Sequence, residues 1–344
     1  AMGNTHLLNS TGSSNARFNP ATLGKIPSMR GFDFQLNHSS VFERWSMPVR
    51  DSFGEFLANA DYVANEFNYY GIRMGLMGST ALPGIGSLGI GLHYFPLTHF
   101  NYQYSEEVRG SYSIEDGEYA SKDPVVGYQN LKTAGSPIVN SLGCGIKLDF
   151  LENIDLSIGG ALNIVGSTNI IDEVSVDTLY SDVINLSTLP NMNASVKMPS
   201  NNFMTYSTTI KISPNIQFGA ALEEEMNAST NLYSWSIDST NGLFQFFEDS
   251  SYVTKGVNYL KPEIFTVALS YISDLENMIS INFEYNQVYY NDHLNLNDYN
   301  QYKFGFEYLT HTGTPIRGGL MYRKTAISAI KPVSIFTFGS GKSI

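Results

Sequence analysis

The sequence predicts an all-β protein, a transmembrane antiparallel β-barrel plugged by its own N-terminal residues. Three observations predict this fold. Apolar residues alternate with small or polar ones in segment after segment, short and long connections alternate between those segments, and charge is sparse. Only 15% of the 344 residues are charged, against about 25% in an ordinary soluble domain. Together these features are typical of barrels that face lipid on the outside and a polar lumen on the inside.

The alternation is clear in two predicted strands. Residues 142–150 read LGCGIKLDF and residues 302–308 read YKFGFEY, with the apolar set on the even positions. A water-soluble sandwich would place charges densely on the polar parity, because that parity would face solvent. Here the polar parity is mostly Gly, Ser, Asn and Ala. The apolar parity is therefore expected to face lipid.

Connection lengths divide the chain into about twelve strands. Outer-membrane barrels have short periplasmic turns and longer extracellular loops, and the long connections here are expected around residues 41–66, 105–136, 167–202, 223–261, 291–299 and 324–332. The predicted strands are 28–40, 67–81, 84–104, 137–150, 153–166, 203–213, 215–223, 262–272, 278–290, 300–309, 314–323 and 333–342.

The last predicted strand descends to the periplasmic side at Ile344 without a partner for its outer edge. An open edge in lipid would leave backbone groups without hydrogen bonds. Two expectations follow: a C-terminal hairpin is missing and the full protein has about fourteen strands, or the twelve strands close on themselves. A closed barrel has no free edges, so we expect a monomer.

Two segments depart from the alternation. Residues 1–27 are small and polar and are predicted to enter the lumen as a plug, ahead of a barrel over 28–344. In the first long connection, apolar residues at helical spacing predict a short amphipathic helix over 48–65. This helix either caps the barrel mouth or offers a platform to a hydrophobic ligand. The platform residues are Phe53, Phe56 and Leu57.

Composition and motifs exclude several classes of function. The formal net charge of −12 disfavours nucleic acid as a partner. Cys144 is the single cysteine, so neither an internal disulfide nor a cysteine-based metal site is expected. The sequence has no Gly-x-Ser-x-Gly elbow, and Phe336 occupies the position where a phosphate-binding loop needs its first glycine. We therefore expect no enzyme and no cofactor.

Charged residues on the lumen parity need partners or water. They either form a ladder of ion pairs between barrel and plug, or a basic member binds a ligand carboxylate. The basic candidates are Arg73, Lys211 and Arg317. A separate group of acidic residues lies at predicted extracellular strand ends. It is expected to be a solvated rim or to bind divalent cations that bridge to lipopolysaccharide. Its members are Glu223, Glu224, Glu225, Asp292 and Asp298.

The run SSNARFNPATL over residues 13–23 resembles the plug signature of the FadL-type outer-membrane transporters, which carry long-chain fatty acids and other hydrophobic compounds. The hairpins over 212–220 and 304–322 are similar to that family's repeated turn and strand. The resemblance implies a fourteen-stranded barrel of the bacterial outer membrane, a hatch in its lumen, an apolar receiving groove and lateral exit through a strand kink. It places the plug gate at Asn19, Pro20 and Ala21.

The sequence thus predicts passive transport of fatty-acid-like molecules, driven by the ligand's gradient and its burial from water. Outer-membrane lipid and lipopolysaccharide are expected to surround the barrel. We find no motif for coupling to an energy source. The competing hypothesis is a shuttle of the type IX secretion system, because those barrels share the Asn-Pro-Ala triplet and bind exported protein cargo.

Overall fold

A computed structural model gives the structure of the chain. Within the part of the chain that it describes, no helix is long and apolar enough to cross a membrane. The described residues are 2–10, 12–25, 28, 30–50, 52–109, 125–151, 154–178, 192–230, 236–238, 243–245, 257–273, 279–291 and 296–341. The side chain of Leu57 and residues Asp292, Lys342 and Ser343 lie outside this description.

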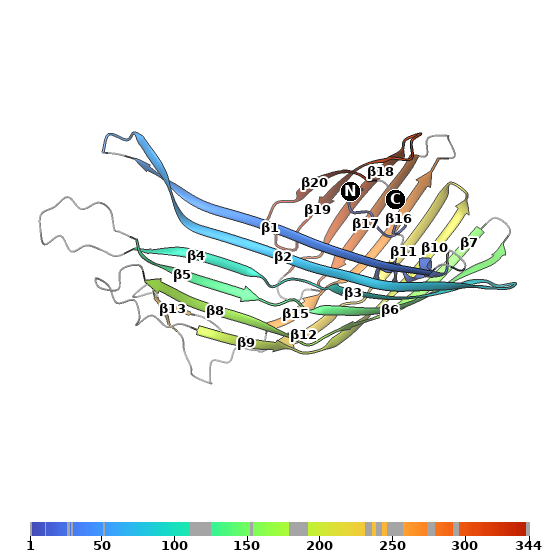
Figure 1. Ribbon diagram of the computed structural model, residues 1–344, viewed down its shortest axis with the longest axis horizontal. Coiled ribbons are helices and arrows are strands. Elements are labelled where there is room, and N and C mark those ends of the chain that lie inside the picture. Colours follow the sequence, from blue (N-terminus) through green and yellow to red (C-terminus); the bar gives the residue numbers. More distant parts are fainter. Residues whose placement is uncertain are drawn as a thin grey trace, which may run out of the picture.

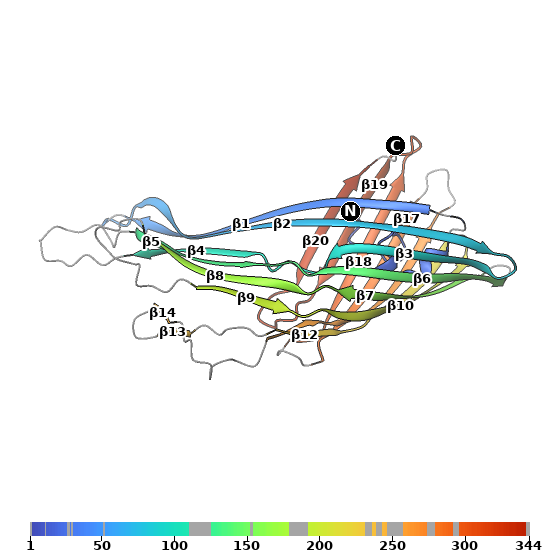
Figure 2. The same ribbon diagram turned by 60° about the horizontal axis from the view of Figure 1, so that its bottom comes forward.

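Sixteen strands of the described ranges form one antiparallel sheet, and twelve of them make a continuous curved wall (Figures 1 and 2). Each of the twelve predicted strands overlaps one wall strand, so the predicted order is confirmed. The wall strands are β1 (Arg30–Arg50), β2 (Phe56–Leu82), β3 (Gly86–Pro96), β6 (Ile138–Leu151), β7 (Ile154–Val165), β10 (Asn201–Ser213), β11 (Ile216–Glu223), β16 (Glu263–Ile272), β17 (Ile279–Tyr289), β18 (Tyr299–Leu309), β19 (Pro315–Arg323) and β20 (Val333–Ser340).

The long connections contain strands of their own. Beyond the wall, the sheet continues from the first half of β2, which we call its distal half because it lies toward the tip of the β1–β2 hairpin. The added strands, in spatial order, are β4 (Tyr102–Arg109), β5 (Val125–Ala134), β8 (Thr168–Thr178) and β9 (Met192–Met198). We call these four strands, with the distal halves of β1 and β2, the extension; it projects from one end of the wall (Figure 1). Two further pairs are β12 (Met226–Thr230) with β15 (Val257–Lys261) and β13 (Ser236–Asp238) with β14 (Leu243–Gln245).

The predicted helix over 48–65 is wrong. The segment is the end of β1, a turn and the start of β2, and the two strands stay paired from Arg30 and Gly78 up to Arg50 and Phe56. β2 is 27 residues long, which is about 90 Å. The spacing of the apolar residues fits a helix as well as an irregular strand, since the register slips at Trp45 and again at Val49. Continuous ladder hydrogen bonds to β1 decide the outcome.

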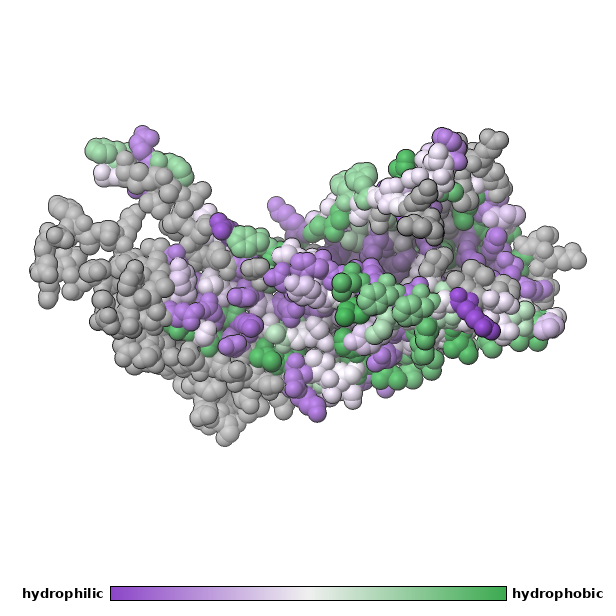
Figure 3. Space-filling view, in the orientation of Figure 1, coloured by the Kyte–Doolittle hydropathy of each residue, from purple (hydrophilic) through white to green (hydrophobic). Residues whose placement is uncertain are grey.

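The two faces of the wall differ as the alternation predicts. Outward side chains are apolar and exposed, among them Phe34, Leu76 and Leu92, and Figure 3 shows such hydrophobic residues over the wall. Inward side chains are small or polar and buried, among them Ser141 and Asn163, whose side chains share a hydrogen bond of 2.5 Å. The wall therefore has an apolar outside and a polar inside.

The inner face carries the N-terminal segment, which we define as residues 2–25. It contains the helix α1 (Asn15–Phe18) and the 3-10 helix η1 (Pro20–Gly24). Wall glycines let its backbone approach: a Cβ on Gly145 would lie 2.0 Å from the Pro20 carbonyl oxygen, and one on Gly319 would lie 1.9 Å from the Gly3 nitrogen. A side chain at either position would displace the segment.

The strands β1 and β20 end the wall. No ladder between them occurs within the described residues, so closure of the twelve strands on themselves is not shown. The N-terminal segment contacts both edge strands from inside. Gly3 donates its backbone N–H to the Thr337 hydroxyl on β20 (2.8 Å), and Ser13 donates its backbone N–H to the Asp33 carboxylate on β1.

Candidate ligand site above the N-terminal segment

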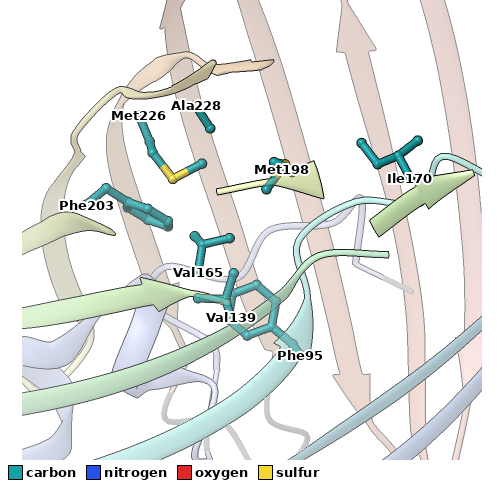
Figure 4. Close-up of a cluster of buried hydrophobic side chains, with 8 residues drawn as sticks. All are labelled: Phe95, Val139, Val165, Ile170, Met198, Phe203, Met226 and Ala228. Atoms are coloured by element: carbon teal, nitrogen blue, oxygen red, sulfur yellow. The ribbon is translucent and has the colours of Figure 1, made fainter. Parts of the chain in front are cut away.

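An apolar cluster lies where the wall meets the extension (Figure 4). Its residues come from the distal ends of four wall strands and from the first strands beyond them. They are Phe95, Val139, Val165, Ile170, Met198, Phe203, Met226 and Ala228, with Leu97, Phe100 and Tyr259 packed against them. This cluster is the larger of the two buried apolar clusters in the part of the chain that the structure describes.

A charged centre adjoins the cluster on the side of the N-terminal segment. The Arg17 guanidinium makes two hydrogen bonds to the Glu223 carboxylate, 3.1 and 3.2 Å long, and the Lys261 ammonium lies 2.9 Å from the same carboxylate. Arg17 lies 4.2 Å from the ring centre of Phe95, and Lys261 lies 4.5 Å from that of Phe203. The centre holds two cations against one carboxylate, beside aromatic rings that favour cations.

A second carboxylate anchors the start of the N-terminal segment. Glu284 is 1% exposed and accepts the backbone N–H groups of His6 and Leu7 at 2.9 and 3.1 Å. Its other oxygen accepts from the Lys303 ammonium at 2.6 Å. Leu7 packs into a small cluster with Ala221 and Ala268. This buried ion pair therefore fixes the segment to β17 and β18.

The predicted gate residues lie against the wall. Asn19 is fully buried, and its side-chain amide donates to the Leu7 carbonyl (2.5 Å). Ala21 donates its backbone N–H to the Ser207 hydroxyl (2.9 Å), and the Pro20 carbonyl approaches Gly145. Asn19 thus joins the two halves of the N-terminal segment, while Pro20 and Ala21 seat its second half. Their role as a gate stays a prediction.

The other predicted site residues do not come together. Phe53 and Phe56 are exposed at the tip of the β1–β2 hairpin, at the far end of the extension. Arg73 is on the inner parity of β2, which faces the N-terminal segment at Gly75. Lys211 and Arg317 lie near the short turns at the opposite end of the wall.

Arg317 is already paired. Its guanidinium donates to the Glu307 carboxylate at 2.5 Å, and both side chains line a cavity of about 620 Å³ beneath residues 2–10. That cavity is also lined by the polar residues Asn4 and Asn9. Of the two hypotheses for the lumen charges, the ion-pair ladder describes Arg317 and Glu284 as they stand.

Sequence reasoning missed Arg17 and Lys261 as site residues and placed Glu223 on a solvated rim. The structure corrects this placement, because Glu223 is 7% exposed and paired with both cations. One signal was available: Glu223 continues the inward parity of Ala221 on β11, whereas Glu224 does not. Nothing in the sequence shows that Lys261, on β15, reaches the same point.

Lys25 gives the N-terminal segment a pH dependence. Its ammonium donates to the Gln217 side-chain oxygen (2.6 Å), and burial, reinforced by the positive charge of Lys211, lowers its pKa to about 8. The unfolded chain, with a pKa of 10.5 for this group, then binds more protons than the folded one between these values. Stability should therefore rise as pH rises from about 8 to about 10.5.

We expect this rise to be smaller in Lys25→Met, which keeps the side chain's length without its charge. The measurement is the midpoint of thermal unfolding at a series of pH values, for both proteins in the same detergent. An identical pH dependence in the two proteins would contradict the assignment to Lys25.

Comparisons with known proteins give structural likeness alone. No family model matches the chain, and no curated protein matches its sequence. The toluene transporter TodX of Pseudomonas putida aligns over 100% of this chain and 87% of its own, with 14% identity and a TM-score of 0.52. A TodX mutant described as a monoaromatic hydrocarbon channel aligns over 99% and 87%, with 16% identity and a TM-score of 0.50.

A Pseudomonas aeruginosa FadL homologue aligns over 94% of this chain and 78% of its own, with 13% identity and a TM-score of 0.49. At such identities a likeness shows the fold and leaves the ligand open. The antiparallel wall and its strand order nevertheless agree with the alignment of TodX over the whole of this chain. The fold of this chain is therefore the FadL-type barrel fold, as its resemblance to that family implies.

Proposed function

We propose that the protein is a passive transporter of hydrophobic small molecules in the bacterial outer membrane, with long-chain fatty acids as its ligands, and that it is not an enzyme. The observation that carries the proposal is the apolar cluster beside the Arg17–Glu223–Lys261 centre. An acyl chain would lie among the cluster residues, and its carboxylate would lie near the two cations.

One face of the extension leads toward this cluster. Tyr104 on β4, Leu131 on β5 and Val174 on β8 are successive cross-strand neighbours and so share one face of the sheet. Ile170, four residues before Val174 on the same parity, belongs to the cluster. This face would receive the ligand outside the membrane and carry it inward, which gives the exposed Phe53 and Phe56 at the tip a role in first contact.

The N-terminal segment would act as the hatch below the cluster. It is held against the wall by Glu284, Ser207 and Asp33, so as a hatch it would block the lumen without a covalent bond. Local movement around Asn19, Pro20 and Ala21 would let a ligand pass. The driving force would be the ligand's concentration gradient, because burial from water favours binding without energy input.

Placing a charge in the cluster tests the proposal. Met226 is 2% exposed and lies on β12, outside the wall, so Met226→Asp should leave the wall folded. We expect binding of a fluorescent long-chain fatty acid to the purified protein to weaken at least about tenfold, and its uptake by cells to fall in parallel.

The matched control is Asn227→Asp, because Asn227 is the next residue on β12 and its side chain is exposed. It adds a negative charge of the same kind at the opposite face, and we expect unchanged binding. If Met226→Asp binds and transports the fatty acid like the control, the cluster is not the ligand site.

The extension favours one second candidate, the secretion-shuttle function. It presents β4, β5, β8 and β9 beside the distal halves of β1 and β2, and β9 is the last strand of the sheet on that side. A shuttle would hold an exported protein on this surface. Stable co-purification of one large exported protein with the barrel, together with failure to bind fatty acid, would favour the shuttle over the transporter.

A further inference from the structure

The last part of the chain has an unusual charge. From residue 308 to the end the sequence contains no Asp or Glu, although the whole chain has 32 acidic residues and a net charge of −12. The basic residues of this part are Arg317, Arg323, Lys324, Lys331 and Lys342. Two of them, Arg323 and Lys324, are adjacent at the distal end of β19, on the same side of the wall as the extension.

These two residues line a cavity of about 340 Å³ at that end of the wall. The cavity combines the two cations with two tyrosines and two isoleucines. Its principal lining residues are Tyr290, Tyr299, Arg323, Lys324, Ile327 and Ile330. Its volume falls within the range of ligand sites, about 300–1,000 Å³. The cavity lies over β17–β19, whereas the wall residues of the apolar cluster lie on β3, β6, β7 and β10.

The loop that covers the cavity is held by its own hydrogen bonds. Asn297 donates its backbone N–H to the Ala326 carbonyl (2.8 Å), which ties the loop before β18 to the loop after β19. The Thr325 hydroxyl lies 2.8 Å from the Ile327 carbonyl oxygen and 3.0 Å from that of Ile330. The two isoleucines are each 50% exposed. The cavity is therefore built by fixed backbone, with apolar side chains still open to a ligand.

The two cations of this cavity, Arg323 and Lys324, make no ion pair within the described ranges of the chain. Asp298 belongs to the same end of the wall, but its carboxylate accepts the Tyr290 backbone N–H at 2.6 Å. Two cations beside exposed isoleucines match a molecule that has an anionic headgroup on a hydrocarbon chain.

We propose that this cavity is a separate binding site for an acyl chain with an anionic headgroup. Arg323 and Lys324 bind the headgroup, Tyr290 and Tyr299 flank it, and Ile327 and Ile330 pack against the chain. A carboxylate of a fatty acid and a phosphate of lipid A share this chemistry. As an entry site for fatty acids the cavity would extend the proposed transport function, but binding there does not depend on transport.

The test uses the full chain in an uncharged detergent and the double variant Arg323→Gln, Lys324→Gln. The probes are a fluorescent long-chain fatty acid, its methyl ester and purified lipid A. All measurements are made in the Met226→Asp background, so that binding at the apolar cluster contributes little. We expect the double variant to weaken fatty-acid binding about tenfold and to leave methyl-ester binding unchanged.

Lys331→Gln is the matched control, because Lys331 is an exposed cation of the same basic part of the chain and does not line the cavity. It should bind all three probes like the parent. If lipid A alone binds and the double variant loses it, the site is confirmed with membrane lipid as its ligand. If the double variant binds fatty acid and lipid A as the control does, the proposal is overturned, whatever the transport assay shows.

Discussion

Replacing Glu223 by glutamine is expected to destabilise the folded protein by about 3–5 kcal/mol, since removing one partner of a buried ion pair leaves an uncompensated charge. Here two cations, Arg17 and Lys261, would remain close together and nearly buried, with side chains 12% and 5% exposed. The measurement is unfolding of the purified protein in denaturant. The variant should also release α1 from the wall, because the guanidinium of Arg17 is what ties α1 to β11.

Glu225→Gln is the control for this prediction. Glu225 is two residues further on, is exposed and makes a side-chain hydrogen bond to Asn291 (3.1 Å). An exposed polar contact contributes about 1 kcal/mol or less, so this variant should stay close to the parent. Equal stability of the two variants would mean that the Arg17–Glu223–Lys261 centre does not hold the N-terminal segment.

Replacing Gly159 by valine is expected to displace the N-terminal segment and open the lumen. An added Cβ at Gly159 would lie 2.4 Å from the backbone nitrogen of Ala21 and 2.4 Å from the carbonyl carbon of Pro20. Neither atom is the end of a flexible side chain, so the whole segment must move. We expect single-channel conductance in planar bilayers to rise well above that of the parent.

The adjacent glycine supplies the control. A Cβ on Gly160 points to the other face of β7, where the nearest atoms are the Thr205 carbonyl oxygen at 3.9 Å and a Tyr206 ring carbon at 4.0 Å. Gly160→Val is therefore expected to keep the parent's low conductance, with the same change in strand propensity. High conductance in both variants would point to a general loosening of β7 instead.

The wall could be predicted from the sequence because alternation with period two depends only on which face meets apolar surroundings. Residues 142–150 and 302–308 follow it without a break. The extension could not be predicted in the same way. Segments such as β4 (YQYSEEVR) carry charges on both faces and read as polar loops, and they form strands where β2 offers them a free edge beyond the wall.

The candidate site was harder to predict than the wall. Phe53 and Phe56 were placed on a helix because their spacing fits one, yet pairing with β1 fixed that segment as strand. Arg17 and Glu223 are separated by 206 residues and meet only because α1 docks on β11. Spacing along the chain carries no information about such a meeting, whereas the glycines that permit the docking are visible in the sequence.

The contacts of Gly3 with β20 and of Ser13 with β1 also bear on how the protein assembles. The hydrogen bond from Gly3 to Thr337 joins residues 334 positions apart, so this contact can form only once β20 is in place. Contacts of such long range slow folding, because loop closure must precede the contact energy. Docking of Gly3 therefore depends on β20, the edge strand of the described wall that is farthest from it in sequence.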